Sequence, residues 1–408
     1  MSDRLLGGID IHDPNNKAYL KKFRDLIVNI YSYKDEDLYP AIVYASFNFY
    51  EYDNNLADII LEISGSNDQF SLYSIAAQLN RSIDLIKSKS RFRDSFLNLS
   101  NVRTASKGTI SRIDSILYQL APDVPELVAD FFKSFQLSRK EEELNEENKL
   151  SNLFSSSFRF LLINHSDIRD KMITEWSVTR DIKLHNELSS LIMESKKINS
   201  EQDLKPKFQK SILDQYSDQD VEYMARKVMG YIYDGYALCS LIFSLLNKNK
   251  IDQYLYDLVY SFFDDYLLDN YLGTVKRFLK NEDKTFNRRQ KKLSTQLTKR
   301  IDNQLQKLKS LNFLNELRVP SFKRNRVLRE SSKRSSRYMD KAEQKSPFLS
   351  IISKKPIKHG RKFTMLTDDG FSTSGGMKKH SSSFEIPKNE LIDPVGNNIY
   401  RINNRYFK

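Results

Sequence analysis

Cysteine and histidine are scarce in this chain. Its 408 residues contain one cysteine and five histidines. A single thiol, Cys239, cannot form an internal disulfide, and its neighbours Leu238 and Leu241 predict a buried side chain in a reducing compartment. The histidines are scattered and, with one cysteine, show no spacing typical of a zinc site. We therefore expect no disulfide framework, no metal and no cofactor.

Turn residues and long apolar runs are also sparse. The 12 Gly and 10 Pro are fewer than a many-stranded fold needs for its turns. The longest nearly uninterrupted apolar run, residues 236–246, is about half of the roughly 20 residues that span a bilayer. The N-terminus, MSDRLLGGID, has no apolar core of a signal peptide. We expect neither a membrane-spanning segment nor a secretory signal.

What the chain has instead is helical periodicity. Across most of residues 17–318, apolar side chains recur at spacings of three and four, as Tyr19, Phe23 and Ile27 do, which is typical of amphipathic helices. No sequence signature repeats at a fixed period. The predicted fold is all-α, an irregular helical-repeat-like (HEAT-like) or compact multi-helix body with a disordered basic C-terminal tail. The expected helices cover residues 19–31, 38–50, 56–63, 72–86, 110–120, 125–137, 153–163, 182–193, 220–246, 251–272 and 293–317.

Composition divides the chain into four parts. Residues 1–137 are predicted to form an N-terminal helical subdomain, and residues 138–150, which begin SRKEEELNEENK, an acidic linker. Residues 151–318 form a C-terminal helical subdomain that ends in a basic amphipathic helix. Residues 319–408 are rich in Ser, Lys, Arg, Gly and Asn. Such a segment buries too little apolar surface to fold alone, so it is predicted to be a disordered or extended tail with an apolar terminal peptide.

Charge is distributed unevenly along the chain. Residues 1–270 carry 32 Lys and Arg against 41 Asp and Glu, whereas residues 271–408 carry 33 against 12. The run from Lys284 to Ile301 contains Asp and Glu at no position. A cationic surface of this kind binds phosphates by releasing counterions, so the last third of the chain is predicted to contact RNA or DNA. The predicted nucleic-acid-binding residues are Arg288, Arg289, Lys291, Lys292, Lys299, Arg300, Lys323, Arg324, Arg326, Lys333, Arg334, Lys354, Lys355, Lys358, Arg361 and Lys362.

Three other uses of these charges stay open. They can form a solvated helix face, serve as nuclear-import signals, or dock on the chain's own acidic cluster of Asp264, Asp265 and Asp269. Phosphorylation would offset nearly two positive charges at each modified serine. The serines within or near the basic clusters are Ser332, Ser335, Ser336 and Ser346.

The last residues are more apolar than the segment before them. A terminal apolar peptide after a spacer commonly docks on a partner or on its own domain. The predicted partner-binding residues are Phe384, Ile386, Ile399, Tyr400, Tyr406 and Phe407.

Local catalytic motifs are lacking, since the sequence has neither a Walker-type phosphate loop nor a nucleophile elbow. We expect a non-enzymatic scaffold or adaptor whose helical body binds the protein subunits of a larger assembly. The expected location is the nucleus, or otherwise a cytoplasmic ribonucleoprotein. The main alternative is a nucleoprotein that coats single-stranded RNA and oligomerises through terminal arms. An enzyme whose site is assembled from distant residues is the third hypothesis.

Overall fold

The computed structural model describes residues 17–196, 203–310 and 387–408, and between the last two ranges residues 326, 329–331, 333, 334, 337, 362–366 and 372–376. This part of the chain is all-α, as predicted, apart from one antiparallel pair of strands. In that pair, β1 (Lys362–Leu366) and β2 (Ser372–Gly376) align Lys362 with Gly376. The chain forms two compact units, residues 1–298 with 384–408, and residues 299–383.

The first unit contains nearly all described helices. Its earlier helices are α2 (Lys17–Ser32), α3 (Tyr39–Phe49), α4 (Asn55–Ser64), α5 (Gln69–Arg81), α6 (Ile83–Ser88), α7 (Ser90–Asn98), α8 (Lys107–Leu120), α9 (Pro125–Ser138), α10 (Leu150–Leu153), α11 (Ser155–Asn164), α12 (Ser166–Val178), α13 (Ile182–His185) and α14 (Leu188–Met193). Its later helices are α15 (Lys210–Leu213), α16 (Asp218–Tyr231), α17 (Gly235–Ser244), α18 (Gln253–Phe262), α19 (Leu268–Glu282), the start of α20 (Arg288–Ser310), α23 (Lys388–Ile392) and α24 (Pro394–Arg405). In the part of the chain that the structure describes, no helix is long and apolar enough to cross a bilayer.

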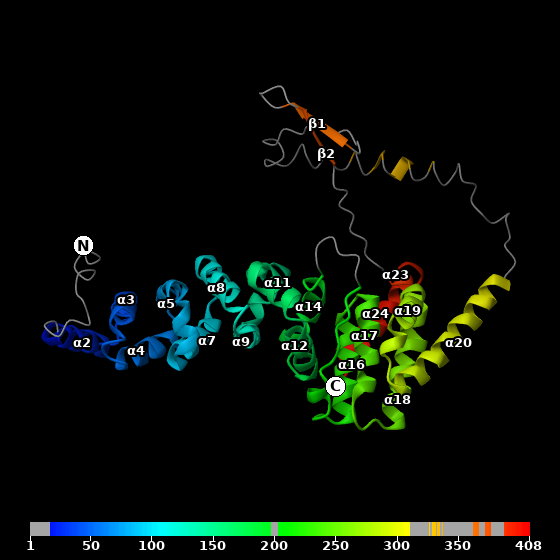
Figure 1. Ribbon diagram of the computed structural model, residues 1–408, viewed down its shortest axis with the longest axis horizontal. Helices are drawn as coiled ribbons and strands as arrows, with labels where there is room; N and C mark the ends of the chain where they lie inside the picture. Colours follow the sequence, from blue (N-terminus) through cyan, green and yellow to red (C-terminus); the bar gives the residue numbers. More distant parts are fainter. Residues whose placement is uncertain are drawn as a thin grey trace. The chain divides into compact units, whose positions relative to one another are not determined.

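Helices α3 to α12 are stacked in two layers (Figure 1). In one layer α3 packs on α5, α5 on α8 and α8 on α11; in the other α4 packs on α7, α7 on α9 and α9 on α12. Each helix thus contacts its counterpart in the next pair, which is the arrangement of a helical repeat. The first-layer helices begin at Tyr39, Gln69, Lys107 and Ser155, at unequal intervals of 30, 38 and 48 residues. This irregularity explains why the sequence shows no fixed period.

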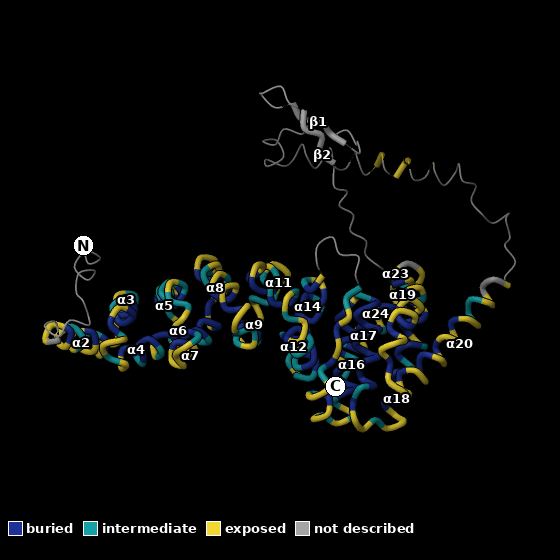
Figure 2. The backbone as a smooth tube through the Cα atoms, in the orientation of Figure 1, coloured by how far each residue is buried: buried dark blue, intermediate teal, exposed yellow. Residues whose placement is uncertain are grey.

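Buried residues run along the helices of this row (Figure 2), and many of them are aromatic. Phe96 of α7 stacks on Phe131 of α9 with ring centroids 5.0 Å apart, and Phe154 lies 4.9 Å from Phe135. All four side chains are fully buried. Polar side chains also join neighbouring pairs, since Asp114 of α8 accepts a hydrogen bond of 2.9 Å from the N–H of Ser157 in α11. Apolar contact and these polar ties together fix each pair on the next.

Several of the predicted helices are interrupted, and the segment 182–193, for example, is divided into α13 and α14. The segment 72–86 breaks at Ser82, whose φ and ψ of −129° and 52° are not helical. The segment 220–246 breaks at an extended Ile232, and Asp234 then caps α17 by accepting from the N–H of Ala237. The segment 251–272 contains a π-helical turn at 263–267 and a non-helical Tyr271. Local capping and packing therefore end these helices where apolar periodicity continues.

Residues 138–150, the predicted linker, lie within the first unit, and Arg139 and Leu150 are the buried residues among them. They contain two short 3-10 turns, Glu141–Glu143 and Glu146–Asn148. Arg139 is buried and donates to the side-chain oxygen of Gln136 at 2.8 Å. Glu143 accepts from the N–H and hydroxyl of Thr104 at 2.9 and 3.0 Å. Glu143 thus joins this segment to the residues between α7 and α8, and the segment does not separate two compact units.

The predicted disordered tail, residues 319–408, is wrong for the last residues of the chain. From Lys388 the chain is helical again, and α24 packs on α16 while α23 packs on α19 (Figure 1). Most of residues 319–386, including Ser332, Ser335, Ser336 and Ser346, lies outside the described residues.

Candidate nucleic-acid interface and the docked C-terminal helix

The start of α20 is fixed by its own polar residues. Asn287 caps the helix, because its side-chain oxygen accepts from the N–H groups of Arg289 and Gln290 at 3.0 and 2.9 Å. The side-chain oxygen of Gln290 accepts a hydrogen bond from the N–H of Asn287, and its side-chain nitrogen donates to the carbonyl of Phe243 in α17. Leu293 and Leu297 are fully buried. These contacts set which side chains of α20 face solvent.

The solvent-facing side chains of this helix are mostly cationic. Arg288 and Lys291 are exposed, as are Lys284 just before the helix and Lys250 after α17. Arg289 donates to the backbone carbonyls of Lys248 and Asn249 at 3.0 and 3.3 Å, which places Lys250 near the start of α20. We call Lys250, Lys284, Arg288, Lys291 and Lys292 the basic surface.

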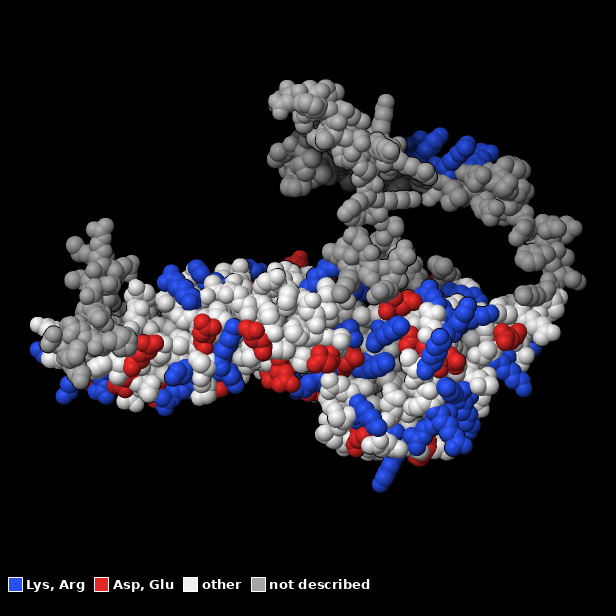
Figure 3. All heavy atoms as spheres, in the orientation of Figure 1, with Lys and Arg blue, Asp and Glu red and all other residues white. Residues whose placement is uncertain are grey.

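Few of these cations have an anionic neighbour. Among the described residues, no ion pair joins Lys284, Arg288 or Lys291 to a carboxylate. The ammonium of Lys292 lies 5.1 Å from the ring centre of Tyr256. In Figure 3, Lys and Arg side chains gather over α18, α19 and the first turns of α20. This surface keeps its positive charge available to an external anion.

Along the N-terminal helices many cations are instead paired. Ion pairs of 3.1 Å or less there join Arg24 to Asp53, Lys34 to Glu62, Lys87 to Asp123, Arg91 to Asp58 and Lys133 to Glu175. The contrast agrees with the charge asymmetry of the sequence, since Asp and Glu outnumber Lys and Arg in residues 1–270 and are far fewer than Lys and Arg in residues 271–408.

The predicted nucleic-acid residues fall into four groups: those on α20, those at 326–334, Lys362, and those outside the described residues. Arg288, Arg289, Lys291 and Lys292 lie on α20 in the first unit, and Lys299 and Arg300 are exposed on its continuation in the second unit. Arg326, Lys333 and Arg334 are exposed, and Arg326 pairs with Glu330 at 3.0 Å. Lys362 belongs to β1. Lys323, Arg324, Lys354, Lys355, Lys358 and Arg361 lie outside the described residues.

Several cations of this region escaped the sequence prediction. Lys276 and Lys280 are exposed four residues apart on α19, so they share one face of that helix. Lys284 and Arg288 continue the spacing of four. This regular spacing indicates one basic face. The sequence prediction relied on a run without Asp or Glu, and it left out Lys276 and Lys280 because Glu282 and Asp283 interrupt that run. Lys250 lies too far away in sequence to be grouped with α20.

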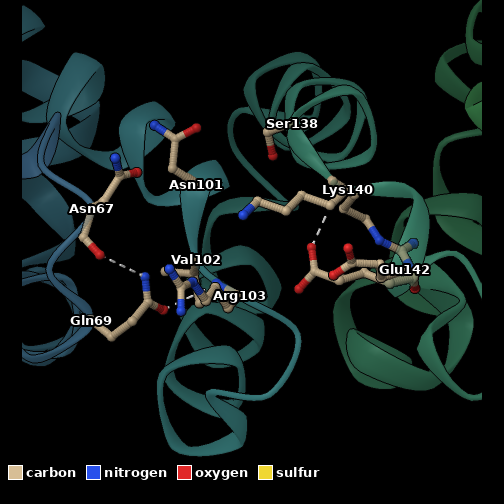
Figure 4. Close-up of a pocket in the computed structure, with 10 residues that line it drawn as sticks. Asn67, Gln69, Asn101, Val102, Arg103, Ser138, Lys140 and Glu142 are labelled. Carbon is tan, nitrogen blue, oxygen red and sulfur yellow. Dashed lines mark hydrogen bonds between the residues drawn. The ribbon is translucent and has the colours of Figure 1, made fainter.

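A polar groove of about 360 Å³ opens between the α5, α7 and α9 regions (Figure 4). Its walls include Asn67, Gln69, Asn101, Arg103 and Lys140. Several of its polar groups already have partners. The side-chain oxygen of Gln69, for example, accepts from the N–H of Arg103 at 3.1 Å. Desolvation opposes the charge of Glu143, yet hydrogen bonds from Thr104 hold the pKa of this carboxyl below its usual range. We therefore interpret the groove as a polar contact between neighbouring helix pairs.

A second cavity of about 660 Å³ lies on the other side of Arg139, lined also by Glu187, Tyr231 and Arg405. Glu187 is buried, and desolvation raises its pKa. Its Oε1 accepts from the N–H of Leu150 at 3.3 Å, while Oε2 has no protein partner. Across the described residues, no cluster of three or more His, Cys, Asp or Glu side chains has the geometry to hold a metal ion.

The C-terminal helix α24 is attached to α16 chiefly by arginines. Arg401 is buried, donates to the carbonyls of Gly230 and Ile232 at 2.9 Å each, and lies 3.5 Å from the ring centre of Tyr233. Arg405 also donates to the Gly230 carbonyl at 2.9 Å. The last carbonyls of a helix have no partner within it and carry partial negative charge. Both arginines thus cap the end of α16.

Predicted residues of the terminal peptide contribute to this attachment. Tyr400 stacks on Tyr266 with centroids 4.4 Å apart, and the Phe407 ring lies 4.3 Å from the guanidinium of Arg226. Lys227 donates to the carbonyl of Phe407 at 2.7 Å. Ile399 and Tyr406 are exposed, whereas Phe384 and Ile386 lie outside the described residues. The peptide therefore contacts its own domain through one side and leaves another free.

Comparison with known proteins identifies no relative: no family model, curated protein or solved structure matches this chain.

Proposed function

We propose that this chain is a non-enzymatic helical-repeat scaffold that holds RNA or DNA on the basic surface of α20. The observation that carries the proposal is a group of exposed cations, Lys284, Arg288 and Lys291, that follow one another closely in the chain and make no ion pair among the described residues, whereas several cations of the helical row are paired. Unpaired surface cations release counterions when phosphates replace them, which is the main source of non-specific nucleic-acid affinity. Basic residues beyond α20 would extend the contact.

Protein partners belong to the same proposal. Large aromatic side chains are exposed along the helical row, including Tyr19, Tyr33 and Phe70. Aromatic residues are enriched in protein interfaces, because they bury a large area at low conformational cost. The proposed setting is a nuclear or ribonucleoprotein assembly, supported by the basic clusters at 323–337 and 354–362.

The test is a charge reversal with a matched control. Full-length protein carrying Lys284→Glu, Arg288→Glu and Lys291→Glu is compared with protein carrying Lys21→Glu, Lys22→Glu and Lys89→Glu, which are exposed cations of α2 and of the residue before α7. Both variants change the net charge equally. Affinity for single-stranded RNA and duplex DNA is measured at low salt by fluorescence anisotropy.

We expect the first variant to lose about tenfold or more in affinity, because three phosphate contacts are replaced by repulsion, and the control to lose much less. Equal losses would show that only net charge matters. Absence of binding by the unmodified protein at low salt would exclude the proposal.

A further inference from the structure

The terminal helix α24 is amphipathic, but its polar face is buried and its apolar face is exposed. The side chains that face the body are polar: Asn397, Arg401 and Asn404 are each 4% exposed or less. The side chains that face solvent are apolar: Val395 is 67% exposed, Ile399 53%, Ile402 41% and Tyr406 68%. A surface helix of a globular protein normally buries its apolar stripe. The exposed stripe of α24 is therefore an unoccupied contact surface.

The stripe has the spacing of a helix-packing seam. Val395, Ile399, Ile402 and Tyr406 follow one another at intervals of four, three and four residues. This alternation is that of positions d and a in a heptad repeat, where each side chain fits between those of a facing helix. The exposed residues beside the seam, Asn398 and Asn403, carry no charge. The fitting occupant is another helix with an uncharged apolar ridge.

We propose that this occupant is α24 of a second copy of the chain, packed antiparallel about a two-fold axis. An axis placed midway between Ile399 and Ile402 pairs each of these residues with the other in the second copy. It also pairs Val395 with Tyr406. The same arrangement brings the exposed Asp393, which precedes α24, to the end of the seam where the exposed Lys408 follows the last turn of the second copy. Charges of opposite sign thus flank both ends of the seam.

The size of the seam sets the strength of the contact. Four apolar side chains on each copy lie at the small end of protein interfaces, where association is weak and depends on concentration. The polar attachment of α24 to α16 is made by other side chains, Arg401 and Arg405. Dimerisation therefore leaves that attachment in place. The contact is independent of the basic surface, so either proposal can fail without the other.

Cysteine cross-linking of the full chain tests the geometry. Val395→Cys and Tyr406→Cys are prepared as two separate proteins; the native Cys239 is buried and contributes little background. Antiparallel packing sets position 395 of one copy against position 406 of the other. The two copies of position 395 are then about 16 Å apart along the helix axis, since each residue of a helix rises about 1.5 Å. Oxidation of the mixture should give the disulfide dimer, and oxidation of either protein alone should give little.

Sedimentation equilibrium provides the second measurement. Wild-type protein should show a mass that rises with concentration, and Ile399→Asp should raise the dimer dissociation constant by about tenfold or more. The control is Ile182→Asp, at an equally exposed isoleucine of α13, which should leave the dissociation constant unchanged. A monomer at every concentration overturns the proposal. So does stronger cross-linking of each cysteine protein with itself, or a loss of association in both aspartate variants.

Discussion

A buried arginine is usually paired with a carboxylate, but the charge of Arg401 is compensated by other groups. Its guanidinium is held by two backbone carbonyls and a tyrosine ring, and among the described residues it pairs with no carboxylate. The end of a helix supplies the partial negative charge that compensates burial. Lysine could not replace it, because only the planar guanidinium can bind two carbonyls and stack on a ring at once.

His185 is a second residue whose burial has a measurable consequence. It is 3% exposed, and its ring lies 5.9 Å from that of Tyr223. Desolvation, together with the charge of Lys227, lowers the pKa of His185 from 6.5 to about 4. Between these values the unfolded chain binds a proton that the folded chain does not. Protonation in this range therefore favours the unfolded chain. The free energy of unfolding falls as the pH drops from 6.5 toward 4, and this histidine causes no such loss above pH 6.5.

We expect this histidine to account for about 3 kcal/mol of the acid loss of stability, because each unit of pKa shift corresponds to about 1.4 kcal/mol. Urea unfolding of His185→Gln across this pH range should show a correspondingly shallower dependence than wild type. The matched control for the substitution itself is His165→Gln, at a half-buried histidine. Equal slopes for His185→Gln and wild type would contradict the assignment.

At the scale of single elements, the close approach of α24 to α16 depends on a glycine. A Cβ atom built on Gly230 would lie 2.8 Å from Cγ of Arg405 and 2.9 Å from the Arg405 backbone nitrogen. Such distances are shorter than van der Waals contact, and a backbone atom cannot move aside as a side chain can. Any larger residue at this position must displace α24.

Gly230→Ala should therefore loosen α24 without changing any charge. We expect the amides of residues 397–404 to exchange with deuterium at least about tenfold faster, since local opening becomes cheaper by more than about 1.4 kcal/mol. Gly273→Ala is the matched control in α19, where nothing lies within 4 Å of the new Cβ. The control should gain up to about 1 kcal/mol from helix propensity. Unchanged exchange in Gly230→Ala would refute the close contact.

The sequence predicted the existence of helices better than their ends. Apolar spacing located α2, α3, α4 and α9 to within a few residues. It joined α16 to α17, because the extended Ile232 is itself apolar and leaves the period undisturbed. It did not assign α7, whose apolar positions are few among Arg and Ser. It did not assign α24 either, since the buried face of that helix is polar and the usual amphipathic reading does not apply.

At the scale of the whole molecule, long-range contacts were beyond the reach of sequence patterns. Arg401 and Arg405 counted only as positive charges of a basic tail, because their partner Gly230 lies about 170 residues earlier. The acidic composition of residues 138–150 suggested a linker, yet Glu143 is bound by Thr104 and Arg139 by Gln136. The charge asymmetry, in contrast, survives in three dimensions, since ion pairs follow the sequence distribution of acids.

Stability and nucleic-acid binding should therefore be separable in this molecule. Lys284, Arg288 and Lys291 make no ion pair among the described residues, so replacing them with glutamate removes no contact that holds the fold. The midpoint of thermal unfolding should stay close to that of wild type, because exposed charges contribute little to stability. In a salt series, the slope of log affinity against log salt should become shallower by about two to three, since each lost phosphate contact removes about 0.7–0.9. A lower unfolding midpoint with an unchanged salt slope would place these residues in the fold and the polyanion elsewhere.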